Sequence, residues 1–161
     1  MPRYFCILML LAEGGEHKIL EIWETDDDRA LSIEKLREKY IEYARLKFIR
    51  TPRLIVENVH TKWGIEVSSQ VIKEWRQKSR TRGRIIAIQL LDAMLETAVL
   101  VRTEGDNKKT RGIESVSEFE NYCRIEGKLN KIRIIVKKQP SRYFVYYFGA
   151  VQNNPPMADY S

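Results

Sequence analysis

The chain has 161 residues, of which 43% are hydrophobic and 31% are charged. This profile is typical of a soluble globular protein with one main domain, and it argues against a disordered or membrane-spanning chain. The charge is uneven, since residues 1–52 hold 9 basic and 10 acidic residues whereas residues 53–161 hold 19 and 12. Such a basic excess indicates a partner with phosphates or an acidic protein partner, although solubility alone also accounts for it.

Residues 1–52 are predicted to form a small ββα unit. The runs Tyr4–Leu11 and Lys18–Thr25 flank a Glu-Gly-Gly-Glu turn, which predicts a β-hairpin. Asp26-Asp27-Asp28 then supplies acidic capping residues for a helix, whose apolar residues recur at helical spacing until Thr51-Pro52 ends it. About 50 residues rarely hold a core alone, so we expect this unit to dock on the rest of the chain.

The first apolar run also resembles the core of a signal peptide. It is far shorter than the ~20 residues needed to span a bilayer. A single Arg3 precedes it, and the acidic turn stands where a cleavage site would lie, which favours a first β-strand over a cleaved signal. We therefore expect a cytoplasmic protein, or one delivered into another cell, with no membrane contact.

Residues 53–152 are predicted to fold as a second unit, with helices first and strands afterwards. Two short strands, Leu54–Asn58 and Gly64–Val67, precede a helix that Ser68 or Ser69 caps. The segment Ile85–Ala98 is apolar on nearly every side, which predicts a buried helix. Four strands then follow, at Val99–Thr103, Val116–Glu126, Lys131–Lys138 and Arg142–Val151. The expected fold class is α+β, helices followed by a four-stranded antiparallel sheet, with a loose tail at 153–161.

Metal, cofactor and disulfide chemistry are not indicated by the sequence. Cys6 and Cys123 have no C-x-x-C spacing, and neither His17 nor His60 has a nearby histidine or cysteine. The motifs of serine hydrolases, P-loop proteins, dinucleotide-binding proteins and zinc proteases are missing. We therefore expect no cofactor and no metal.

Three groups of basic residues are candidates for binding nucleic acid, and they lie in residues 73–84, 108–111 and 128–142. The strand Lys131–Lys137 alternates, which places its cations on one face of the sheet. Aromatic residues in the last strand add stacking surfaces of the kind that single-stranded RNA uses, although a central strand packed on both faces explains them better, with Tyr143 and Tyr146 as the expected exceptions. The expected nucleic-acid-binding residues are Lys73, Arg76, Arg80, Arg82, Lys108, Arg111, Lys131 and Lys137.

RNA cleavage without a metal needs a base for the 2′-hydroxyl, cations for the phosphorane and an acid for the leaving oxygen. Glu118 or Glu120 is the candidate base, and Tyr143 is the candidate acid. The candidate cations are Lys109, Arg111, Arg133 and Arg142. Any basic domain of this size offers a comparable set, so these residues alone do not establish a ribonuclease.

A series of spaced matches adds a resemblance to a known family. They are Ile72-Lys73-Glu74-Trp75, Leu90-Leu91, Leu95–Val101, Glu104 to Lys108, Tyr122–Leu129, Ile132–Val136 and Arg142-Tyr143-Phe144. Between about Leu54 and Val151 the chain resembles domains of large polyvalent proteins of phages and conjugative elements, which are assigned to the barnase–EndoU–colicin–RelE-like ribonuclease superfamily. Residues 1–52 carry no such resemblance.

The resemblance implies an active face on the antiparallel sheet and a metal-independent ribonuclease. Lys108, Arg133, Arg142 and Tyr143 match the family by position, whereas Lys109, Arg111 and Glu118 are inferred from charge and placement. Ser117 stands where many relatives carry a histidine, although other branches of the superfamily cleave RNA without one.

Three functions remain open from the sequence. The first is a ribonuclease-like effector or toxin that cleaves RNA, with tRNA as one substrate class. The second is an inactive relative that binds RNA through the same face. The third is a module that holds an acidic immunity-type or antitoxin protein. The sequence does not indicate the oligomeric state.

Overall fold

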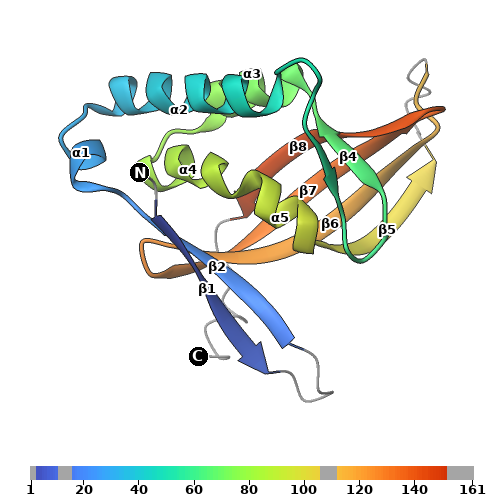
Figure 1. The fold of residues 1–161 in the computed structure, drawn as a ribbon, viewed down its shortest axis with the longest axis horizontal. Coiled ribbons are helices and arrows are strands. Elements are labelled where there is room, and N and C mark those ends of the chain that lie inside the picture. The colour runs from blue at the N-terminus through green and yellow to red at the C-terminus, as the bar shows by residue number, and fades with distance from the viewer. Residues whose placement is uncertain (1–2, 11–15, 106–111, 152–161) are drawn as a thin grey trace.

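A strongly curled β-sheet with helices on one face forms the framework of the computed structural model, which describes residues 3–10, 16–105 and 112–151 (Figure 1). The strands of the sheet are β1 (Arg3–Leu10), β2 (Glu16–Trp23), β3 (Ile55–Glu57), β4 (Gly64–Val67), β5 (Val99–Gly105), β6 (Ser115–Ile125), β7 (Lys128–Gln139) and β8 (Arg142–Val151). The helices are α1 (Asp26–Arg29), α2 (Ile33–Phe48), α3 (Ser69–Lys78), α4 (Arg82–Ala87), the 3₁₀ turn η1 (Ile88–Leu90) and α5 (Leu91–Thr97).

The sheet is larger than the four-stranded one expected. The predicted meander β5-β6-β7-β8 is present and antiparallel, but the full path runs β1-β2-β6-β7-β8-β4-β3, with β5 paired to β6 as the eighth strand. Two parallel pairings make the extension, β2 with β6 and β4 with β8. The prediction of an α+β fold is therefore confirmed, whereas the prediction of a four-stranded sheet is wrong, because the predicted N-terminal hairpin and the two short strands β3 and β4 join the meander.

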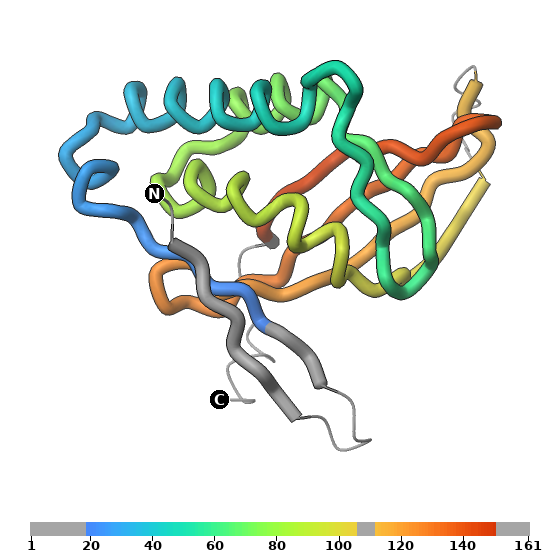
Figure 2. The backbone as a smooth tube through the Cα atoms, viewed as in Figure 1, coloured from blue at the N-terminus to red at the C-terminus, as the bar shows by residue number. Residues whose placement is uncertain are grey.

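The N-terminal hairpin and α2 share the sheet and the core of the rest of the chain. Leu20 to Ile22 of β2 pair with Cys123 to Ile125 of β6. Leu36, Tyr40 and Phe48 of α2 are each 2% exposed or less, and α2 packs on α3 and α4. The smooth trace in Figure 2 shows α2 lying over α4 and α5, on the far side from the sheet. Residues 16–48 thus complete the helical layer and the core.

The acidic run after β2 forms only a short helix. Thr25 caps α1, its hydroxyl accepting a hydrogen bond from the Asp28 N–H at 3.1 Å. The chain then turns, and Ser32 starts α2 by accepting from the Lys35 N–H at 3.3 Å. A side-chain oxygen at each start satisfies an N–H that the helix leaves unpaired.

The apolar segment after α3 is buried, as its composition predicts. Ile85, Ile86, Ile88, Leu90 and Leu91 are all fully buried between the sheet and α2. The segment is three short pieces rather than one helix, since a 3₁₀ turn separates α4 from α5. All helices lie on this side of the sheet, so its other face, hereafter the outer face, has no helix over it in the described part of the chain (Figure 1).

Candidate functional site

The outer face is defined by strand alternation. Along β7, Ile132, Ile134 and Val136 are buried under the helices, so Lys131, Arg133, Ile135 and Lys137 point the other way. Register extends this assignment to the neighbouring strands. The cations of the outer face are Arg102, Arg124, Lys131, Arg133, Lys137 and Arg142, and its carboxylates are Glu21, Glu57, Glu66, Glu104, Glu118 and Glu120. The two charges balance over the whole face, but on β5 to β8 the six cations outnumber the carboxylates Glu104, Glu118 and Glu120.

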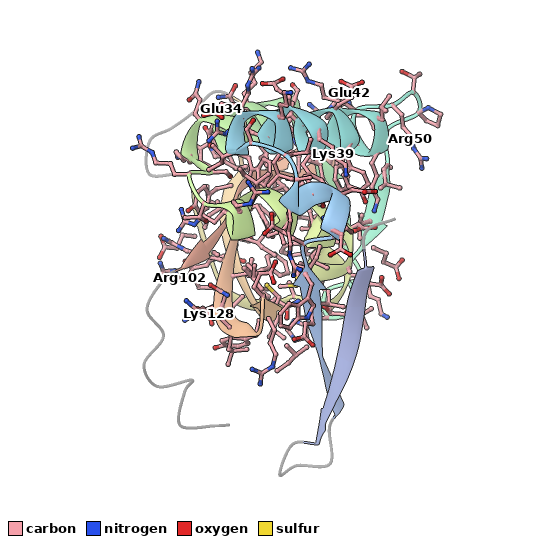
Figure 3. The ribbon with its side chains drawn as sticks, turned by 90° about the vertical axis from the view of Figure 1, so that its left-hand side faces the viewer. Glu34, Lys39, Glu42, Arg50, Arg102 and Lys128 are labelled. Atoms are coloured by element: carbon pink, nitrogen blue, oxygen red, sulfur yellow. The ribbon has the colours of Figure 1, made fainter. Side chains whose placement is uncertain are left out.

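Two arginines hold one carboxylate at the middle of the outer face. Glu118 of β6 pairs in register with Arg102 of β5, whose Nε lies 3.4 Å from Glu118 Oε2. Arg133 of β7 donates from its Nε to Glu118 Oε1. The Glu118 side chain is only 12% exposed, whereas those of Arg102 and Arg133 are 58% and 45% exposed. The guanidinium groups thus present N–H groups to solvent around a covered carboxylate. Figure 3 shows Arg102 on the sheet, away from the α2 side chains Glu34, Lys39 and Glu42.

A second ion pair lies beside the first. Lys131 Nζ is 2.8 Å from Glu120 Oε1, and this hydrogen bond raises the pKa of Lys131 above its usual value. Lys131 is positively charged at neutral pH with or without this shift, so the pair places a cation beside a carboxylate. Glu120 is opposite Arg133 in register, so the two ion pairs are adjacent on β6 and β7.

Aromatic rings alternate with these charges toward the β8 side. Lys137 Nζ lies 3.5 Å from the centroid of the Tyr146 ring, and Tyr146 is 37% exposed. Arg142 lies over the Phe144 ring at 5.5 Å. A β-bulge opposite Ile135 and Val136 leaves Tyr146 without a register partner on β7, so both Tyr146 and Tyr147 lie next to the cations.

Of the expected catalytic residues, Glu118 and Arg133 are in contact, but Tyr143 and Arg142 lie elsewhere. Tyr143 is half-buried, and its ring stacks on Trp63, which also contacts the buried Phe119. Since Phe119 faces the helices, Tyr143 lies on the opposite side of the sheet from Glu118, and the expectation that it is exposed is wrong. Arg142 is opposite Gln139 in register. Gln139 lies four residues along β7 from Ile135, the residue opposite Glu118, so Arg142 is roughly 13 Å from Glu118 along the strands.

The cations of α3 and the connector after it lie in the helical layer. Lys73 and Arg80 are exposed, and Arg76 contacts Glu38 of α2. Arg82 has a packing role, because it donates to Glu24, to the Leu31 carbonyl at 2.9 Å and to the Asp28 carbonyl at 2.6 Å. This group is therefore separate from the outer face. Lys108, Lys109 and Arg111 lie outside the described residues.

Arg102 was missed in the sequence. It occupies the run Val99–Thr103, whose alternation is weak, and its partner Glu118 becomes apparent only from the register of β5 on β6. Tyr122 of the outer face was missed as well, and Phe144 was considered only as one of the aromatic residues of the last strand. A search for cations on strands next to a candidate carboxylate would have found Arg102.

Known features of metal and membrane proteins are not seen in the described segments. There, no group of three or more histidine, cysteine, aspartate or glutamate side chains is placed to hold a metal ion. None of the helices formed by those residues has the length and apolarity to cross a membrane.

Comparison with known proteins gives one match. No curated protein and no solved structure matches the chain. A family model described as large polyvalent protein-associated domain 3 matches residues 32–146, from the start of α2 into β8. The match supports the expected setting of a polyvalent protein of a phage or mobile element. Since it covers well over half of the sequence, the chain belongs to the large polyvalent protein-associated domain 3 family.

Proposed function

We propose that this domain binds RNA through the outer face of its sheet, as the nucleic-acid-binding part of a phage or mobile-element effector protein. One observation carries the proposal: cations and aromatic rings from β5, β6, β7 and β8 stand in register on a sheet face that has no helix over it in the described residues. Phosphates attract the cations, and unpaired bases stack on aromatic rings.

The spacing of the cations on β7 suits a single-stranded RNA. Lys131, Arg133 and Lys137 occupy one face of β7, where Lys131 and Arg133 are about 6.6 Å apart and Lys137 follows about 13 Å beyond Arg133. Such a row supports contacts to successive phosphates of an extended backbone. Tyr146 and Phe144 lie beside the row, where bases that leave the backbone toward β8 would reach them.

RNA cleavage is the second candidate, and the placement of Glu118 favours it. In this scheme Glu118 takes the proton from a 2′-hydroxyl, Arg102 and Arg133 turn from the carboxylate to the charge of the phosphorane, and a water molecule protonates the leaving 5′-oxygen. This chemistry matches the ribonuclease superfamily that the sequence resembles. Tyr143 does not contribute the acid in this arrangement, because it lies on the other face of the sheet.

A binding experiment tests the proposal. The affinity for a fluorescent single-stranded RNA is measured by anisotropy for the wild type and for Arg133→Gln/Lys137→Gln. The matched control, Lys35→Gln/Arg45→Gln, removes the same charge from exposed positions on α2. We expect the sheet variant to bind about tenfold or more weakly and the control to match the wild type. Equal affinity in all three proteins, or no RNA binding together with tight binding of an acidic protein, would overturn the proposal.

A cleavage assay in EDTA separates the two candidates. Glu118→Gln removes the base and one negative charge, so it should bind RNA at least as tightly as the wild type. If the wild type produces fragments ending in 2′,3′-cyclic phosphate and Glu118→Gln does not, the domain is a ribonuclease. If neither protein cleaves and both bind, the function is binding alone.

A further inference from the structure

The ring of Trp23 is exposed at one end of the outer face. Ile22 of β2 is fully buried in the core, so its neighbour Trp23 points to the outer side of the sheet. Trp23 is 40% exposed, although tryptophan carries one of the largest apolar surfaces of any side chain. It lies next to the start of β7, at the opposite end of that strand from Lys137 and Tyr146. A flat, accessible ring at this position is suited to a ligand with an aromatic face of its own.

The turn between β6 and β7 supports one side of the Trp23 ring. Glu126 and Gly127 both have positive φ, at 51° and 80°, which is the geometry of a tight two-residue hairpin turn. The Glu126 N–H donates to the Ile22 carbonyl at 2.9 Å, and the Glu24 N–H donates to the Glu126 carboxylate at 2.8 Å, so the turn is fixed to the end of β2 (Figure 1). Trp23 Cη2 lies 3.4 Å from the point where a Cβ on residue 127 would be. The ring therefore rests against the backbone of this turn.

The Trp23 ring has no stacking partner among the described residues. None of the aromatic pairs and none of the cation–ring contacts found there includes it. The outer-face residues nearest the turn are Arg124 on β6 and Leu129 on β7, which are opposite each other in register. Glu21 of β2 is in register with Arg124, so their charges offset each other. This end of the outer face is therefore suited to stack a base rather than to hold a phosphate.

We propose that Trp23 stacks one base of a single-stranded RNA and marks the end of a binding path along the whole of β7. The path starts beside Lys137 and Tyr146 and follows the cations of β7 to the turn at Gly127. Ten positions separate Lys137 from Gly127, which is roughly 33 Å along the strand. With one nucleotide for every second residue, the path holds about five or six nucleotides. The inference rests on the proposed function, because Trp23 makes no contact with phosphate.

Two substitutions of Trp23 separate base stacking from simple apolar cover of the turn. Trp23→Leu and Trp23→Phe both keep an apolar side chain there, but only Trp23→Phe keeps an aromatic face, and circular dichroism checks the folding of each. For a single-stranded RNA of six nucleotides, measured by calorimetry, Trp23→Leu should bind about tenfold more weakly than the wild type and Trp23→Phe within about threefold of it. Leu46→Ala, which removes another exposed apolar side chain from α2, should match the wild type. Equal affinity of the wild type and Trp23→Leu, or equal losses in Trp23→Leu and Trp23→Phe, would overturn the inference.

Abasic nucleotides locate the base that Trp23 contacts. The same RNA is prepared with the base removed at its 5′ end or at its 3′ end. Each removal should weaken binding to the wild type, because Tyr146 stacks one terminal base and Trp23 the other. In Trp23→Leu, one of the two removals should have no further effect. If both removals weaken Trp23→Leu as much as they weaken the wild type, Trp23 does not stack a base.

The same data separate this inference from the proposed function. RNA binding that Arg133→Gln/Lys137→Gln weakens and Trp23→Leu leaves unchanged would refute the role of Trp23 alone. RNA binding that neither variant weakens would overturn both.

Discussion

The ring of Trp63 stacks on the ring of Tyr143, with centroids 4.2 Å apart and planes 7° apart. Trp63 also meets Phe119 edge-on at 5.6 Å, so the three rings form one cluster under the helices. The cluster joins the loop between β3 and β4 to β6 and β8. The position of Tyr143 therefore points to a packing role, whereas the family resemblance points to chemistry.

The two roles of Tyr143 predict opposite results for one substitution. Tyr143→Phe keeps the stacked ring and removes only the hydroxyl, so RNA binding and any RNA cleavage should stay within about twofold of the wild type. Tyr143→Ala should lower the free energy of unfolding by about 3 kcal/mol because the stacked ring is lost. Urea unfolding and the RNA assays measure both effects. A large loss of cleavage in Tyr143→Phe, with stability unchanged, would restore Tyr143 as the acid.

Asp28 is a buried carboxylate that ties α1 to α2. Lys39 and Tyr40 both donate to it, and its side chain is 1% exposed. Burial acts to raise the pKa of Asp28, but the hydrogen bonds from Lys39 and Tyr40 outweigh burial and hold the pKa below its ordinary value of 3.8. Asp28→Asn should therefore lower the free energy of unfolding by about 2 kcal/mol at neutral pH.

The difference in unfolding free energy between the wild type and Asp28→Asn depends on pH in a defined direction. A carboxyl whose pKa is lower in the folded state stabilises the fold above its unfolded pKa, and the stabilisation is lost as the pH falls through the folded pKa. The gap between wild type and Asp28→Asn should be constant from about pH 5 to about pH 8 and shrink below the ordinary pKa of 3.8. Denaturant unfolding at a series of pH values measures it. If the difference in unfolding free energy between the wild type and Asp28→Asn grew as the pH was lowered, Asp28 would not be held as a carboxylate.

Asn58 fixes the β3–β4 loop to the end of α5. Its side-chain amide donates to the Leu95 and Ala98 carbonyls at 2.7 and 2.8 Å, and its oxygen accepts from the Thr61 N–H at 2.8 Å. Asn58→Asp places an acceptor against two carbonyl oxygens, which should cost about 3 kcal/mol of unfolding free energy.

Asn130→Asp is the control for this substitution. Its amide donates to a single carbonyl, that of Lys128 at 2.8 Å, in an exposed position, so the cost should stay below about 1 kcal/mol. Thermal unfolding of both variants checks the difference. Similar melting temperatures for the two variants would contradict the role given to Asn58.

Local patterns in the sequence predict most of the elements but not how the sheet is assembled. The alternation of Lys131–Lys137 gives both the strand and its two faces, and Ser68 marks the start of α3 because its hydroxyl meets the N–H of Val71. The parallel pairings of β2 with β6 and of β4 with β8 join residues about a hundred and about eighty positions apart. No local pattern encodes such pairings, since they depend on how the helical layer packs.

In the candidate site too, local patterns predict some residues, whereas others depend on how the strands pair. Arg133 and Lys131 were found from alternation, whereas Arg102 depends on the register of β5. The last strand is apolar or aromatic on both faces from Tyr143 to Phe148, so alternation cannot tell which rings face the helices. A β-bulge at Tyr146 also shifts the alternation within the strand. These two features explain why Tyr143 was expected on the exposed side.

The salt dependence of RNA binding tests the central claim most directly, because it counts phosphate contacts. For single-stranded RNA, the logarithm of the binding constant decreases linearly with the logarithm of the salt concentration, with a slope of about −0.7 per phosphate contact. Arg133→Gln/Lys137→Gln should make the slope less steep by about 1.4, and Lys35→Gln/Arg45→Gln should leave it at the wild-type value. A sheet variant with the wild-type slope, or a control with the flatter slope, would show that RNA does not lie on the outer face.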